Sequence, residues 1–73
     1  MDISMHHARV TTPIAYLEGT EREAFIPIGP CLVEARSAAA VDIIWGKRGQ
    51  ISAQLPQDRF HSVRDKGHLV VLD

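Results

Sequence analysis

The stretch from Val41 to Leu55, VDIIWGKRGQISAQL, constrains the fold more than any other part of the sequence. Its two alternating apolar runs are joined by a loop that has two cations between two glycines. If residues 47–49 form a three-residue loop, all the residue pairs on one face of the resulting hairpin are apolar. Those pairs are Trp45 with Ile51, Ile43 with Ala53, and Val41 with Leu55. A loop one residue shorter or longer would mix apolar with polar partners, so the stretch predicts a β-hairpin in this register.

The loop itself has a purely geometric explanation. A three-residue hairpin loop combines a type I turn with a residue in the left-handed conformation. Gly49 occupies that position, and it has no Cβ that would disfavour the conformation. Lys47 and Arg48 are then predicted to be exposed residues at the tip of the hairpin.

Further short strands are predicted on both sides of this hairpin. Alternating apolar residues indicate strands from Val10 to Tyr16 and from Ala24 to Ile28. Because Pro13 has no N–H to donate to a neighbouring strand, we expect the first strand to lie at the edge of a sheet or to bend at Pro13. After Leu55, residues 56–60 (PQDRF) are typical of a single tight helical turn. Asp65-Lys66-Gly67 then predicts a second hairpin turn before a strand from Leu69 to Leu72.

Residues 33–45 allow two interpretations. The alanines in VEARSAAAV favour a helix on propensity, which would make the protein α+β. The β-branched residues Val41, Ile43 and Ile44 favour strands. We prefer a strand, a loop near residues 37–40 and a second strand, because this choice agrees with the register of the following hairpin.

Five or six short strands with one tight helical turn before the last strand form an order that resembles SH3-like and Tudor-like small barrels. The resemblance covers about Pro27 to Asp73 and implies an architecture and not a ligand. The predicted fold is therefore mainly β: a small SH3-like antiparallel barrel with a helical turn near residues 56–60. We expect residues 1–73 to form one domain, with residues 1–8 as a flexible terminus.

Size and composition limit the functional classes. A domain of 73 residues buries only about 60% of the surface that its unfolded chain exposes. The single cysteine, Cys31, cannot form an intrachain disulfide, and we expect it to be a buried apolar side chain. This indicates a reducing compartment, so we expect a cytoplasmic protein. No apolar run is long enough for a membrane span, and we expect no membrane association.

Catalysis and metal binding are not favoured by the residue pattern. The four histidines, His6, His7, His61 and His68, lack the spacing of a metal site. Asp58, His61 and Ser62 lie close in sequence, but only geometry identifies a catalytic triad. A substrate pocket would also take core volume from a small chain. We therefore expect no enzyme activity, no cofactor and no metal.

Charge suggests one functional alternative. The formal net charge is -1, but the part from Lys47 to His68 has a balance of +3. Nucleic-acid binding would use the cations of this basic half. They are Lys47, Arg48, Arg59, Arg64 and Lys66. The hairpin register weakens this alternative, because it turns Trp45 toward the core and away from a base-stacking position.

Excess apolar surface indicates the preferred function. The strand Leu69 to Leu72 is apolar on both faces, so Val70 and Leu72 need cover, as does Ile44 on the polar face of its strand. Either the barrel buries them itself, or a partner does. We interpret the chain as a protein-interaction or regulatory module that forms a homo-oligomer through Ile44, Val70 and Leu72. Lys47 and Arg48 would form the charged rim of this interface.

Overall fold

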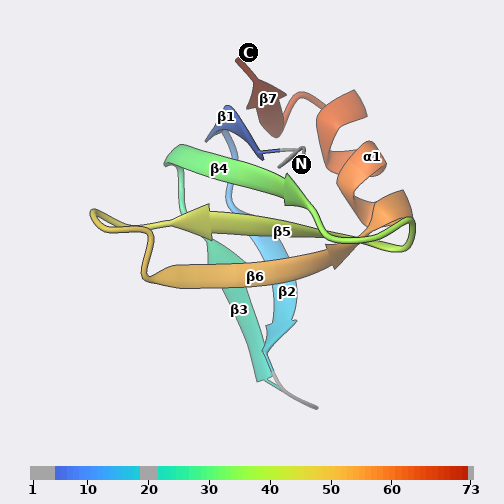
Figure 1. The fold of residues 1–73 in the computed structure, drawn as a ribbon, viewed down its shortest axis with the longest axis horizontal. Coiled ribbons are helices and arrows are strands. Elements are labelled where there is room, and N and C mark those ends of the chain that lie inside the picture. Colours follow the sequence, from blue (N-terminus) through green and yellow to red (C-terminus); the bar gives the residue numbers. More distant parts are fainter. Residues whose placement is uncertain (1–4, 19–21, 73) are drawn as a thin grey trace.

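A computed structural model of the chain describes residues 5–18 and 22–72. These residues form seven strands in two antiparallel sheets and one helix before the last strand (Figure 1). The elements are β1 (Met5–Val10), β2 (Ile14–Glu18), β3 (Arg22–Ile26), β4 (Gly29–Ala35), β5 (Ala40–Trp45), β6 (Ile51–Pro56), α1 (Gln57–Asp65) and β7 (Leu69–Val71). The mainly β class is confirmed, whereas the closer likeness to SH3-like barrels stays a prediction.

The hairpin of β5 and β6 has the predicted register. Ile43 lies opposite Ala53, and the two flanking apolar pairs match in the same way. Gly49 has a φ of 65°, and its N–H donates to the carbonyl oxygen of Gly46 at 3.2 Å. This is the predicted tight turn followed by a left-handed glycine, so the side-chain pattern and the turn chemistry specify the same hairpin.

Residues 33–45 form strand, loop and strand, and the alternative helix is wrong. β4 ends at Ala35 and β5 begins at Ala40, and Val33 lies opposite Ile43. Both of these β-branched side chains are buried, at 5% and 0% exposure. Their burial on a common face outweighs the helix propensity of the intervening alanines.

The helix is longer than the single turn predicted at residues 56–60. α1 covers Gln57–Asp65 and buries Phe60 and Val63, three residues apart on one side of the helix. The predicted second hairpin turn at residues 65–67 is also wrong, because this segment ends the helix. His68 N–H donates to Val63 O at 2.9 Å, and Gly67 N–H donates to Arg64 O at 3.0 Å. With Gly67 at a φ of 75°, these bonds form a Schellman motif.

The flexible terminus predicted at residues 1–8 is in part a strand. Residues 1–4 of the predicted flexible terminus lie outside the described residues, but Met5 to Ala8 belong to β1. β1 pairs with β4 on one side and with β7 on the other. The chain leaves β1 at Thr11 and Thr12, whose N–H groups both donate to His68 O, at 2.8 and 3.4 Å. The strand predicted from Val10 to Tyr16 is therefore two strands separated at Pro13.

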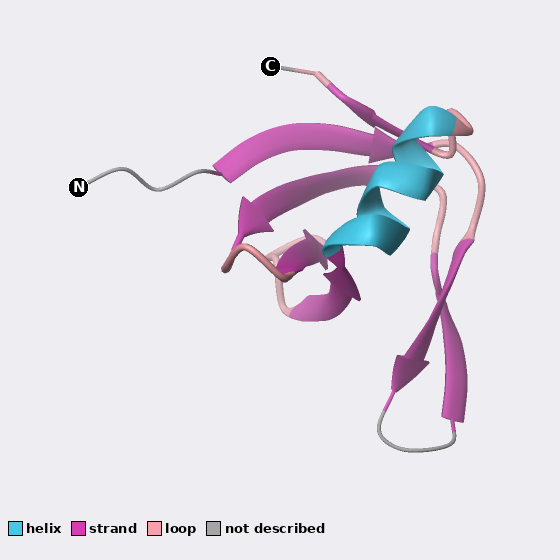
Figure 2. Cartoon of the chain, turned by 90° about the vertical axis from the view of Figure 1, so that its right-hand side faces the viewer, coloured by secondary structure: helices cyan, strands magenta, loops and turns pink. Residues whose placement is uncertain are grey.

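One apolar core joins the elements. The larger sheet contributes one of its faces, α1 contributes Phe60 and Val63, and the hairpin of β2 and β3 contributes Ile14 and Ile26. Trp45 and Tyr16 pack at its margin, with their ring centroids 6.1 Å apart in an edge-to-face arrangement. Beyond this contact, the hairpin of β2 and β3 extends away from the rest of the molecule (Figure 2). The opposite face of the larger sheet takes no part in the core.

Candidate interaction surfaces

The face of the larger sheet that points away from the core, here called the outer face, carries a row of aligned side chains that runs from β6 across β5, β4 and β1 to Leu72, directly after β7. The register pairs Ile44 with Ser52 on one side and with Leu32 on the other. It also pairs Leu32 with His7, and Leu72 N–H donates to His7 O at 2.8 Å. We call this set the central row: Ser52, Ile44, Leu32, His7 and Leu72. Since side chains alternate between the faces of a strand, all five belong to the outer face.

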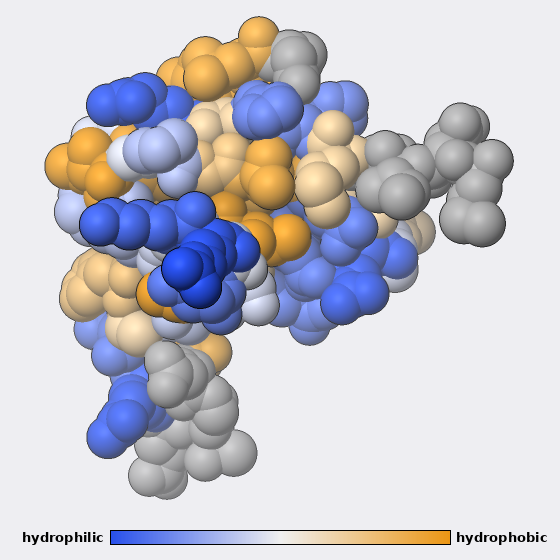
Figure 3. Space-filling view, turned by 60° about the vertical axis from the view of Figure 1, so that its left-hand side comes forward, coloured by the Kyte–Doolittle hydropathy of each residue, from blue (hydrophilic) through white to orange (hydrophobic). Residues whose placement is uncertain are grey.

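The apolar residues predicted to need cover lie on this outer face. Leu72 and Val70 expose 62% and 43% of their surface, and Met5 exposes 40%. Ile44 and Leu32 are half-buried, and Val70 lies opposite Arg9 of β1. The structure thus brings Ile44, Val70 and Leu72 to one face. On the side drawn in Figure 3, apolar surface in orange lies directly beside hydrophilic surface in blue.

A groove of about 400 Å³ lies at the end of the outer face nearest the β5–β6 turn. We call it the tip groove. It is lined by His7, Pro30, Cys31, Leu32, Ile44, Trp45, Gly46, Lys47, Arg48 and Gly49. Lys47 and Arg48 are both exposed, and none of the described residues that line the groove is acidic. Three of the five predicted interface residues, Ile44, Lys47 and Arg48, therefore share one groove.

The sequence did not indicate that Leu32 and His7 contribute to this face. Their positions follow from the pairing of β1 with β4, which brings His7 and Leu32, 25 residues apart in the sequence, side by side. In the sequence, alternative strand registers could be compared only for the hairpin of β5 and β6, because its two strands are joined by a short loop. Their contribution could have been predicted only if the polar segment MHHARV had been recognised as a strand.

The other end of the outer face is acidic. Glu34 lies opposite Asp42 in the pairing of β4 with β5. Arg36 Nε donates to Asp42 Oδ2 at 2.6 Å, and this hydrogen bond, aided by the negative charges of Asp42 and Glu34, raises the pKa of Arg36. Two carboxylates and one guanidinium leave this end with a net negative charge.

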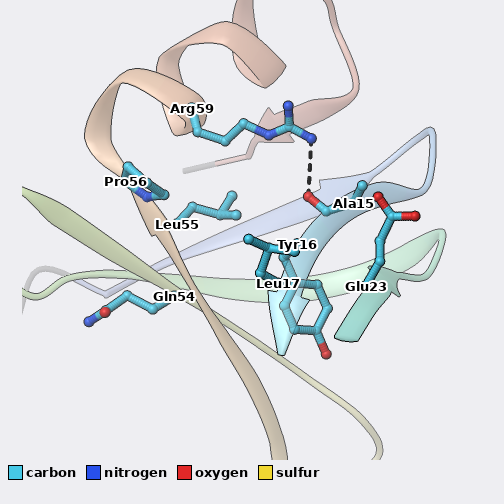
Figure 4. A pocket seen from close by; sticks show the side chains of 8 residues that line it. All are labelled: Ala15, Tyr16, Leu17, Glu23, Gln54, Leu55, Pro56 and Arg59. Atoms are coloured by element: carbon cyan, nitrogen blue, oxygen red, sulfur yellow. Dashed lines mark hydrogen bonds between the residues drawn. The ribbon is translucent and has the colours of Figure 1, made fainter. Parts of the chain in front are cut away.

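A second groove of about 400 Å³, here called the hairpin groove, separates the β2–β3 hairpin from β6 and α1 (Figure 4). It is lined by Ala15, Tyr16, Leu17, Glu23, Gln54, Leu55, Pro56 and Arg59. Arg59 reaches across it from α1, and its Nη2 donates to Ala15 O at 3.0 Å. This hydrogen bond links the projecting hairpin to the helix.

The Arg59 link gives a testable prediction. Replacing Arg59 with leucine keeps the apolar stem but removes the donor, so we expect a loss of about 1 kcal/mol in the free energy of unfolding. Amide hydrogens of β2 and β3 should exchange faster, because the hairpin loses its tie to α1. Arg48→Leu, at the exposed tip, is the matched control and should change neither quantity appreciably. Equal effects of the two substitutions would show that the bond to Ala15 O has no structural role.

The five cations of the nucleic-acid alternative do not share one surface. Lys47 and Arg48 follow β5 at the left-hand turn in Figure 1, whereas the other three lie on or directly after α1 at the right. Arg59 is bonded to Ala15 O, and the Arg64 guanidinium lies over the Phe60 ring at 5.6 Å from its centroid. A nucleic-acid strand would have to contact two separate ends of the molecule.

The structure also shows where the residues considered for catalysis and metal binding lie. Cys31 is buried, as predicted, at 6% exposure, and burial raises the pKa of its thiol, which disfavours the reactive thiolate. Asp58, His61 and Ser62 all lie on α1, and the Asp58 carboxylate accepts the Arg59 N–H at 2.9 Å. In residues 5–18 and 22–72, no three His, Cys, Asp or Glu side chains are grouped as metal ligands.

Comparison of the chain with protein-family models, curated proteins and solved structures gave no match. Within the described ranges, no helix has both the length and the apolar character needed to cross a membrane. The candidate interaction surfaces are therefore the basis for assigning a function.

Proposed function

We propose that this protein is a non-enzymatic interaction module that associates with a second copy of itself through the outer face of its larger sheet. The proposal is carried by one observation: the register places the exposed Leu72 and the half-buried Ile44 in the same row of that face. Val70 adds apolar surface beside this row. Apolar side chains aligned across a sheet offer a continuous contact to a second sheet.

The energetic reason for association is the hydrophobic effect. Burying exposed apolar surface contributes about 25 cal/mol per Å², and Leu72, Val70 and Met5 each leave at least 40% of their surface exposed. The cations Lys47 and Arg48 at the tip groove keep part of the face hydrated and form its charged rim. A contact with an apolar centre and a polar rim is the usual arrangement of protein interfaces.

Solution mass tests the proposal. Light scattering at several concentrations, in low and in high salt, should give a dimer population that grows with concentration. Because the central contact is apolar, much of the association should survive high salt, whereas phosphate binding would weaken steeply as salt rises. A monomer at every concentration and in both salts would refute the proposal. Titration with nucleic acid would then test the alternative.

A further inference from the structure

We infer that two copies pack outer face to outer face about a two-fold axis that runs along the central row, across the strands. This arrangement places Lys47 and Arg48 of each copy over the Glu34 end of the other. The inference rests on the proposed function, because it specifies the partner and the orientation for the same surface. The observation behind it is a change of charge along the strands.

The outer face has a basic end, an apolar centre and an acidic end. At the basic end, Arg9 lies opposite Pro30 and Val70, and Lys47 and Arg48 follow at the hairpin tip. The central row comes next. At the acidic end, Glu34 lies opposite Asp42 and Met5.

Charge decides which two-fold axis the face can use. When two identical faces pack together with two-fold symmetry, the axis lies in the plane of contact, and if residue i of one copy contacts residue j of the other, residue j of the first also contacts residue i of the second. An axis along the strands would leave the basic ends together and the acidic ends together, and like charges placed opposite one another are unfavourable. An axis across the strands reverses their direction, so each basic end meets an acidic end.

The same axis also suits the apolar residues. Residues that lie on a two-fold axis meet their own copies, so Ile44, Leu32 and Leu72 of the central row would each contact the same residue of the second copy. No polar side chain would be inserted between these apolar ones, apart from His7. The charge pattern and the apolar row therefore select one arrangement.

The size of the face sets the expected affinity. Five strands at a spacing of about 4.8 Å give a width of about 19 Å, and strands of 6 residues at about 3.3 Å per residue give a length of about 20 Å. The face therefore covers about 400 Å², which is half of the roughly 800 Å² per partner of standard interfaces. We therefore expect a weak, concentration-dependent dimer whose orientation depends on the charges at its two ends.

Charge reversal at the tip tests the orientation. Lys47→Glu should weaken dimerisation at least about tenfold in low salt, because attraction to the Glu34 end becomes repulsion at both symmetry-related contacts. Lys66→Glu makes the same charge change at the end of α1, away from the outer face, and should leave the dissociation constant unchanged. Adding Glu34→Lys to Lys47→Glu should restore most of the affinity, since the charges are then exchanged.

Each outcome of this series of variants either supports or overturns the proposed two-fold axis. Selective weakening by Lys47→Glu, with recovery in the double variant, supports the axis across the strands. A wild-type dimer that responds equally to both lysine substitutions, or is not recovered by Glu34→Lys, overturns this axis while leaving self-association intact. A wild-type monomer at all concentrations overturns both the axis and the proposed function. Circular dichroism of each variant establishes that the fold is retained.

Discussion

Replacing Ile43 with alanine should lower the melting temperature by about 10–30 °C, because it leaves a cavity at the centre of the core. Ile43 is 0% exposed and lies between Val33 of β4 and Ala53 of β6. Such a substitution costs about 2–5 kcal/mol, a large part of the roughly 4–11 kcal/mol expected for a chain of this length. Thermal unfolding followed by circular dichroism measures the effect.

The neighbouring residue provides the matched control. Ile44 carries the same side chain one position further along β5, but it points to the outer face and is half-buried. Ile44→Ala should cost about 1 kcal/mol or less in a dilute, monomeric sample. Equal destabilisation by the two alanine substitutions would contradict the assignment of opposite faces to these adjacent residues.

Replacing Leu72 with aspartate should abolish dimerisation over the accessible concentration range, corresponding to at least about a hundredfold increase in the dissociation constant. Leu72 is 62% exposed, so the substitution should leave the monomer folded. In the proposed dimer, however, it would bury carboxylates against apolar side chains. Sedimentation equilibrium measures the association, and circular dichroism checks the fold.

Leu17→Asp is the control for this loss. Leu17 is 70% exposed, but it lies on β2 and lines the hairpin groove, away from the outer face. The same chemical change there should leave the dissociation constant unchanged. Loss of dimerisation by Leu17→Asp and not by Leu72→Asp would place the interface on the projecting hairpin instead.

The hairpin of β5 and β6 could be predicted because its information is local. Its register depends on the alternation of Val41, Ile43 and Trp45 with the residues just beyond the turn, and Gly49 fixes the turn type. The same alternation, continued from Val33, correctly favoured strand, loop and strand over a helix. No distant part of the chain is needed for either inference.

The end of α1 could not be predicted in this way. Asp-x-Gly occurs both in hairpin turns and after helices, because both need a residue in the left-handed conformation. Only Phe60 and Val63 mark the buried side of the helix, and two apolar residues are a weak helical pattern. The deciding bonds, from His68 and Gly67 to the last turn, involve the backbone and leave no trace in the side-chain pattern.

The identity of β1 depends on distant pairing. MHHARV contains few apolar residues, yet β1 lies between β4 and β7 and buries Ala8 and Val10 completely or nearly so. For the same reason, only part of the outer face could be predicted from the sequence. Ile44, Val70 and Leu72 were recognised as apolar residues needing cover, but the position of Leu32 and His7 between them required the pairing of β1 with β4.

Amide chemical shifts, measured over a range of protein concentrations, show directly whether the outer face is the contact between two copies. We expect concentration-dependent shifts in residues 5–9, 30–34, 42–48 and 70–72, with α1 and the hairpin groove unaffected. Shifts concentrated on α1 or on the β2–β3 hairpin, or the absence of any concentration dependence, would contradict the proposed contact.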